Sequence, residues 1–251
     1  MKHRLSTLLA FVLAIGCGSS STGASPASEP GAGASASGSE ASGESAPAPE
    51  AQSAPDDGMQ VEGILGTIPR TAARTALQAK MPRFLQCFAN RAAEVDVLGG
   101  RADLLFHVAT DGSVAWARLT ASTVGDRVTE RCLLDVAATV RFPRPEGGEA
   151  EVTDAIDVPL PADVRPPLDW TEARVSQAVR RLASARRSCR VGDATMNVTA
   201  YVGPGGEVLA AGAAASVREA DDTIDCVVEA VRSASFPDPG SYPAKVRFAL
   251  P

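Results

Sequence analysis

Residues 132–145 and 226–239, CLLDVAATVRFPRP and CVVEAVRSASFPDP, carry the pattern that decides the fold. In each stretch a cysteine is followed by apolar residues at helical spacing and then by Phe-Pro-x-Pro. Proline cannot continue a helix, and it biases the residue before it towards extended geometry. Each stretch therefore predicts a helix that ends at a sharp corner. Because the pattern occurs twice, the sequence predicts a duplicated domain.

The repeat extends upstream of both stretches. A turn glycine followed by x-Val lies at the same distance before each of them, as Gly112 and Gly206. Farther upstream, each copy has an amphipathic helical segment and a second cysteine, which is Cys87 or Cys189. Each copy thus has the predicted order helix, strand, strand, helix, strand.

These patterns predict an α+β fold of two tandem small domains, residues 59–161 and 162–251. Each is expected to be a three-stranded antiparallel sheet packed on two helices. Pro82 predicts a kink or a restart of the first helix. The apolar faces of the first copy's two helices are expected to hold Leu77, Met81, Phe84, Leu85 and Phe88, and Val128, Cys132, Leu133, Val136 and Val140. The strands are expected over residues 102–109, 113–119, 152–158, 197–202, 207–211 and 245–250.

The N-terminus has the anatomy of a bacterial export signal. A basic start is followed by a short apolar segment, and Leu13-Ala14-Ile15-Gly16-Cys17 resembles a lipobox. The apolar segment is much shorter than the roughly 20 residues that span a bilayer. Residues 1–16 are therefore interpreted as a cleaved lipoprotein signal peptide and Cys17 as the lipidated residue. Because Gly18 rather than aspartate follows Cys17, we expect an outer-membrane lipoprotein with its domains in the periplasm, with exposure at the cell surface as the alternative.

Residues 17–58 consist almost entirely of Ser, Ala, Gly, Pro and Glu. Such a segment cannot bury enough apolar surface to offset the entropy lost on ordering. We expect a disordered tether between the lipid and the domains. The formal net charge of the chain is −6, and residues 59–251 lack the basic excess of a nucleic-acid-binding protein.

Paired cysteines of an exported protein normally form disulfides. Four cysteines allow three pairings, but a unit that evolved alone before its duplication must have bridged itself. This argument pairs Cys87 with Cys132 and Cys189 with Cys226. The alternatives are a zinc site, which favours close ligand pairs, and a redox site, which needs Cys-x-x-Cys. Neither spacing occurs in the sequence, so we expect structural disulfides and no metal.

Several motifs combine into a recognisable pattern. They are Leu85-Gln86-Cys87-Phe88, Asp111-Gly112-Ser113-Val114, Ser122-Thr123, Cys132 and Phe142-Pro143, with Ser241-Tyr242-Pro243 in the second copy. Together they resemble the C-terminal domain of myxobacterial gliding proteins of the AgmX/PglI type, which is similar in layout to the TonB C-terminal domain. The resemblance covers nearly all of residues 62–158 and, more loosely, 170–251, and it departs at Arg187-Ser188-Cys189-Arg190, where an aromatic residue usually follows the cysteine. It implies a cell-envelope or motility-associated role and no particular reaction.

No catalytic constellation is recognisable in the sequence. After removal of the signal the only histidine is His107, and no serine or cysteine motif accompanies it. We therefore expect a noncatalytic module that binds envelope proteins and needs no cofactor. Exposed sheet edges can accept a partner strand, and duplication is expected to supply two such edges.

Two alternatives stay open. Arg180, Arg186, Arg187 and Arg190 fall within about one third of a helix circumference and form a candidate face for an anionic envelope polymer or a lipid headgroup, although such a face is more often simply solvated. The other alternative is an enzyme with a site assembled from scattered carboxylates. Trp116 and Trp170 are candidate partner anchors, but core packing is the commoner fate of a strand tryptophan.

Overall fold

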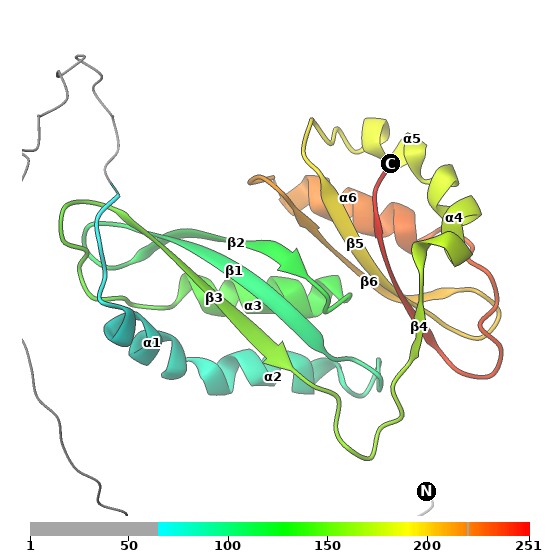
Figure 1. Ribbon diagram of the computed structural model, residues 1–251, viewed down its shortest axis with the longest axis horizontal. Helices are drawn as coiled ribbons and strands as arrows, with labels where there is room; N and C mark the ends of the chain where they lie inside the picture. Colours follow the sequence, from blue (N-terminus) through cyan, green and yellow to red (C-terminus); the bar gives the residue numbers. More distant parts are fainter. Residues whose placement is uncertain (1–64, 220) are drawn as a thin grey trace, which may run out of the picture. The chain divides into compact units, whose positions relative to one another are not determined.

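The computed structural model describes residues 65–219 and 221–251 (Figure 1). The signal peptide, Cys17 and the tether lie outside these residues, so the predictions for them stay predictions. The described chain is α+β, as expected, with one three-stranded and one four-stranded sheet. We refer to residues 65–161 as the first half and to residues 162–251 as the second half.

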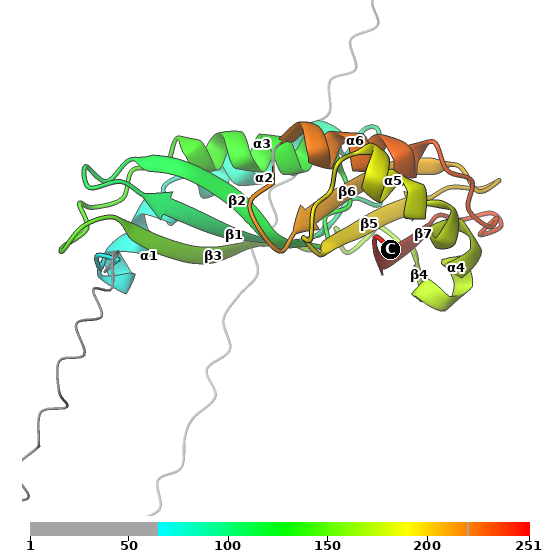
Figure 2. The same cartoon turned by 90° about the horizontal axis from the view of Figure 1, so that it is seen from above.

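The first half has the expected sheet. Its strands pair in the order β2-β1-β3, and both pairings are antiparallel. Helices α2 and α3 pack against one face of this sheet (Figures 1 and 2). The elements are α1 (Arg70–Gln78), α2 (Met81–Arg91), β1 (Gly100–Val108), β2 (Val114–Ser122), α3 (Arg127–Ala138) and β3 (Ala150–Val158).

The second half differs from the expected three-stranded sheet. A short additional strand, β4, pairs in parallel with β7, so the sheet is mixed and has the order β4-β7-β5-β6. The prediction of a purely antiparallel sheet was wrong here because three residues are too few to give an alternating pattern. The elements are β4 (Leu168–Trp170), α4 (Glu172–Arg181), α5 (Ala183–Ser188), β5 (Met196–Val202), β6 (Val208–Ala215), α6 (Asp221–Arg232) and β7 (Ala244–Ala249).

The first helix of each half is divided in two. In the first half α2 restarts at Met81, with Pro82 in its first turn, where a missing N–H costs nothing. The predicted restart at Pro82 is confirmed. In the second half the break lies at Leu182, between α4 and α5.

Two residues of the predicted apolar faces point to solvent. Leu85 is 46% exposed and Val128 is 51% exposed. The buried face of α3 is instead centred on Thr129, Glu130 and Leu133, each 0% exposed. The prediction was wrong for Val128 because the polar residues Thr129 and Glu130 occupy the interior face of α3, whereas Leu133 and Val140 are buried as expected.

Equivalent glycines join the hairpin of each half to its Phe-Pro corner. Gly112 has φ +85° and Gly206 has φ +86°, a region that other residues rarely adopt. The backbone N–H of Phe142 donates to the carbonyl of Gly112 at 2.9 Å, and that of Phe236 donates to Gly206 at 3.0 Å. A Cβ on either glycine would overlap the carbonyl oxygen of the same phenylalanine.

We therefore predict that Gly112→Ala and Gly206→Ala destabilise the protein to a similar extent. The left-handed backbone alone costs a residue with a Cβ roughly 1–2 kcal/mol, and the overlap adds to this cost. Urea unfolding monitored by circular dichroism measures both. Gly192, where a Cβ would meet nothing, is the control position, and an equal loss of stability in Gly192→Ala contradicts the prediction.

Both expected disulfides are present. Cys87 pairs with Cys132, which joins α2 to α3, and Cys189 pairs with Cys226, which joins the end of α5 to α6. The Cα atoms of the two pairs are 5.7 and 5.5 Å apart. Each bond therefore lies within one half.

Candidate functional site

The start of α3 is fixed by its capping residue. Asp126 accepts a hydrogen bond from the backbone N–H of Thr129 at 2.9 Å, as an N-cap aspartate does. The same carboxylate accepts a hydrogen bond from Nε of Arg91 on α2 at 3.0 Å. Held in this way, α3 presents Arg127 and Glu130 to the second half.

Glu130 lies fully buried between the two halves. Its carboxylate accepts one hydrogen bond from Oγ of Ser122 on β2 at 2.6 Å and another from the backbone N–H of Ala213 on β6 at 3.1 Å. Burial raises the pKa of Glu130 from 4.5 to about 7, because these hydrogen bonds offset only part of the desolvation. Gly212 makes room for the carboxylate, since a Cβ there would overlap it.

Arg127 is the second buried charge between the halves, and its side chain is 8% exposed. It forms ion pairs with Asp221 at 2.7 Å and with Asp225 on α6 at 2.8 Å. Burial acts to lower the pKa of Arg127, but the hydrogen bonds to both aspartates outweigh it and the pKa is raised. Nη1 of Arg127 has no hydrogen-bond partner among the described residues.

Tyr201 on β5 is fully buried and reaches across to the first half. Its hydroxyl donates to the carbonyl of Gly99 at 3.0 Å, and Nζ of Lys245 donates to the same oxygen at 2.7 Å. Burial raises the pKa of Tyr201 to about 12 and lowers that of Lys245 to about 8. Thr199 donates through Oγ1 to the carbonyl of Ser122 at 3.1 Å.

We call this polar layer the seam; its side chains are Ser122, Arg127, Glu130, Thr199, Tyr201, Asp225 and Lys245. An unpaired buried polar group costs about 1–3 kcal/mol. Each half supplies hydrogen-bond partners to buried groups of the other, so any shift of one half against the other would leave such groups unpaired. Strand β6 is almost entirely buried, with Ala210 and Ala214 in the core of the first half and Ala211 and Ala213 in that of the second. Sequence reasoning missed the seam, because no local pattern of the sequence marks it.

The seam also decides which sheet edges are accessible. The edge of β6 faces the first half, where Glu130 accepts the N–H of Ala213 and Arg118 donates to the carbonyl of Ala215 at 3.2 Å. The edge of β7 is paired with β4 over Ala244 to Val246. The expectation of two equivalent open edges was therefore wrong, because β7, the counterpart of β3, carries an extra strand.

The outer edge of β3 is not paired with any described strand. Over its nine residues β3 pairs with β1 on one side, and no other described strand pairs with it. Its exposed side chains include Glu151, Asp154 and Asp157. An unpaired edge offers a row of backbone donors and acceptors, and its charges restrict which strand can pair with it.

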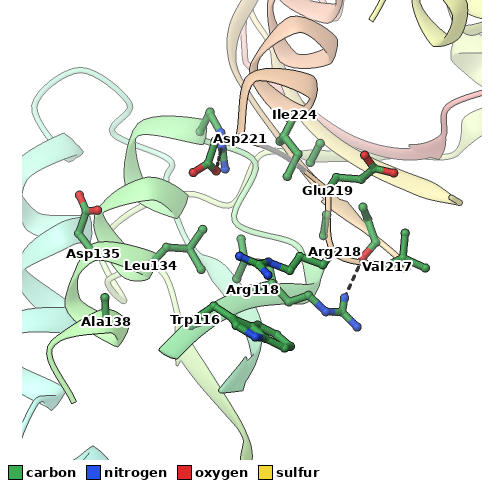
Figure 3. Close-up of a pocket in the computed structure, with 16 residues that line it drawn as sticks. Trp116, Arg118, Leu134, Asp135, Ala138, Val217, Arg218, Glu219, Asp221 and Ile224 are labelled. Atoms are coloured by element: carbon green, nitrogen blue, oxygen red, sulfur yellow. Dashed lines mark hydrogen bonds and ion pairs between the residues drawn. The ribbon is translucent and has the colours of Figure 1, made fainter. Parts of the chain in front are cut away.

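A groove of about 590 Å³ lies beside the seam (Figure 3). It runs between β2 and α3 of the first half and the segment after β6. Trp116, Arg118 and Arg218 line one part, and Leu134 and Ile224 line another.

The four arginines of the predicted anionic-ligand face do not act alike. Arg180, Arg187 and Arg190 are exposed. Arg186 uses its guanidinium within the molecule, because Nη2 donates to the carbonyl oxygens of Gly192 at 2.6 Å and Ala194 at 2.9 Å. The predicted face assumed one continuous helix, whereas α4 and α5 are separate helices. Anionic-ligand binding stays a prediction for Arg180, Arg187 and Arg190 only.

The aromatic candidates take different places. Trp170 is 7% exposed and belongs to the second core, with the guanidinium of Arg174 4.6 Å from its ring centre. Trp116 is only partly buried. Its ring stacks on that of His107 at 4.9 Å, and Nε2 of His107 lies 2.8 Å from the carboxylate of Glu149.

The described chain thus defines an α+β protein of two disulfide-bonded halves joined by a buried polar seam. In the part of the chain that the structure describes, no helix is long and apolar enough to cross a membrane. No cluster of three or more histidine, cysteine or acidic side chains within residues 65–219 and 221–251 could hold a metal ion. Comparisons with protein-family models, curated proteins and solved structures find no match for this chain.

Proposed function

We propose that this protein is a lipid-anchored, noncatalytic binding module of the cell envelope. In this proposal Cys17 carries the lipid at the outer membrane, the tether holds the folded part in the periplasm, and the two halves are diverged copies of one domain. The shared strand order, the equivalent disulfides and the equivalent Gly112 and Gly206 support the duplication. An extended segment of an envelope protein is the proposed partner.

The single observation that carries this proposal is the open edge of β3. Main-chain hydrogen bonds along a free edge give affinity for an added strand, and the side chains beside it give specificity. The seam covers β6, and β4 covers the first part of β7. β3 is therefore a nine-residue edge that no other described strand pairs with, and it has no counterpart of that length in the second half. Helix α1 lies beside its first part, where Arg70 and Arg74 line a groove together with Glu151 and Asp154.

The side chains of β3 indicate the chemistry of the partner strand. The exposed side chains of β3 itself include three acidic residues, Glu151, Asp154 and Asp157. Like charges on paired strands are unfavourable, whereas opposite charges stabilise a cross-strand pair by roughly 0.2–1 kcal/mol. The proposed partner segment is therefore extended and carries lysine or arginine.

A photo-crosslinking residue at Thr153, which is exposed on β3, tests the proposal. In envelope extracts it should capture a partner through an extended, basic segment that mass spectrometry identifies. Glu151→Lys with Asp154→Lys should reduce this capture at least fivefold. The matched control is the same crosslinker at Ala173, an exposed position on α4. Equal capture at both positions, or capture that survives the charge reversal, rejects strand addition at β3.

A further inference from the structure

The groove beside the seam (Figure 3) carries two arginines that have no carboxylate partner among the described residues. Neither Arg118 nor Arg218 forms an ion pair with any described residue. Arg118 uses Nη1 to bond the carbonyl of Ala215, so the rest of its guanidinium keeps its donors. Both side chains line the same groove.

Arg218 is held by an aromatic stack. Its guanidinium lies 5.1 Å from the ring centre of Trp116, and the ring of Trp116 also stacks on that of His107 at 4.9 Å. A guanidinium that packs by its face keeps its N–H edges free for a planar oxyanion. The stack thus orients a donor edge in the groove and offers apolar area beside it.

Arg127 lines the inner side of the groove. Its side chain is 8% exposed and lines the groove, and Nη1 is a buried donor without a partner among the described residues. Its ion pairs with Asp221 and Asp225 use the other nitrogens.

The remaining walls are mostly apolar. Leu134 and Ile224 face the groove from α3 and α6. Three acidic residues line it. Asp221 is paired with Arg127, Asp135 lies at the margin with its carboxylate directed away from the two unpaired arginines (Figure 3), and Glu219, next to Arg218 in the chain, forms no ion pair with a described residue. The groove therefore combines a cationic part with an apolar part. Its whole volume, about 590 Å³, is usual for a ligand site.

We infer that this groove binds the C-terminal carboxylate of a polypeptide whose last side chain is apolar. Arginine and carboxylate form bidentate, charge-assisted hydrogen bonds, which Arg118 and Arg218 are placed to donate. A C-terminal residue has its side chain next to its carboxylate, so the apolar walls and the arginines are engaged together. This site is distinct from the edge of β3, and the inference does not depend on strand addition there.

The test uses the disulfide-bonded full chain with Cys17→Ser and the probe acetyl-Ala-Ala-Leu, with either a free carboxylate or a C-terminal amide. Binding is followed through the indole N–H resonance of Trp116 and by calorimetry. We expect the acid to bind at least tenfold more tightly than the amide. Arg118→Gln with Arg218→Gln should weaken binding of the acid at least tenfold. Arg218→Gln alone, at an exposed position, should weaken it at least threefold.

Arg174→Gln is the matched control, because this arginine also packs on a tryptophan, Trp170, but outside the groove; it should bind the acid as the parent chain does. Equal affinity for acid and amide, no response of Trp116 at millimolar probe, or undiminished binding by the double variant overturns the inference. Sodium acetate that competes at the concentration of the peptide also overturns it, since the apolar walls would then contribute nothing. A chain with Glu151→Lys and Asp154→Lys should still bind the acid, which separates this result from the outcome at β3.

Discussion

Replacing Glu130 by glutamine should stabilise the protein above pH 7 and abolish most of its pH dependence between pH 4.5 and 7. Glu130 is fully buried, and its pKa is about 7 in the folded protein against 4.5 for the free side chain. The folded state therefore binds more protons than the unfolded state in this interval. Its stability is greatest below pH 4.5 and falls as the pH rises through the folded-state pKa.

The size of this effect follows from the shift in pKa. At 1.36 kcal/mol for each pKa unit, the ionisation of Glu130 costs roughly 3 kcal/mol of stability by pH 8. Glutamine has the same shape and no charge. Its amide oxygen can accept the N–H of Ala213, and its amide nitrogen can donate to Oγ of Ser122, so both contacts are preserved.

Urea unfolding of the parent chain and of Glu130→Gln at several values between pH 4.5 and 8.5 measures this difference. Tyr201 does not interfere, because its folded pKa of about 12 lies far above this range. Lys245, with a folded pKa of about 8, adds proton linkage at the alkaline end of the range, but this linkage is common to both chains and cancels in their difference. Glu146→Gln is the control, since Glu146 is exposed. If Glu130→Gln keeps the pH dependence of the parent chain, or is the less stable of the two at pH 8, Glu130 does not ionise at a buried site.

The local patterns of the sequence predicted most of the helices and strands, because the residues that start, end or bend each of them lie within or next to it in the sequence. The Phe-Pro corners, the hairpin glycines and the restart at Pro82 are steric consequences of single residues. The pairing of the cysteines followed from the repeat, and the structure confirms it. Only β4 was missed among the strands, because its three residues carry no periodicity.

The seam could not be predicted because it depends on which faces of the two halves meet. A glutamate within a helix normally faces solvent, so nothing local distinguishes Glu130 from an exposed residue. The same holds for the run over residues 210–215, which has low strand propensity and forms a strand because small side chains let both halves approach it. The groove lies beside this contact and was missed for the same reason.

Removing the Cys87–Cys132 disulfide should destabilise both halves together. The bond closes a loop with a sequence separation of 45 residues, for which the chain-entropy treatment gives about 4 kcal/mol. It joins α2 to α3, and α3 contributes Arg127 and Glu130 to the seam. Weakening α3 in the first half therefore exposes buried polar groups of the second half.

The two tryptophans allow each half to be followed separately. Trp116 lies in the first half and Trp170 in the second. The variant Trp170→Phe keeps Trp116 and so reports on the first half, and the variant Trp116→Phe keeps Trp170 and reports on the second half. With Cys87→Ser and Cys132→Ser in either background, both reporters should show the same unfolding midpoint, lowered by an amount equivalent to about 4 kcal/mol. Each reporter background with its disulfides intact is the reference. If the Trp170 midpoint stays at its reference value while that of Trp116 falls, the halves unfold independently. The seam would then contribute no coupling between them, and the inference that Arg127, Glu130 and Tyr201 make the two halves unfold together would be wrong.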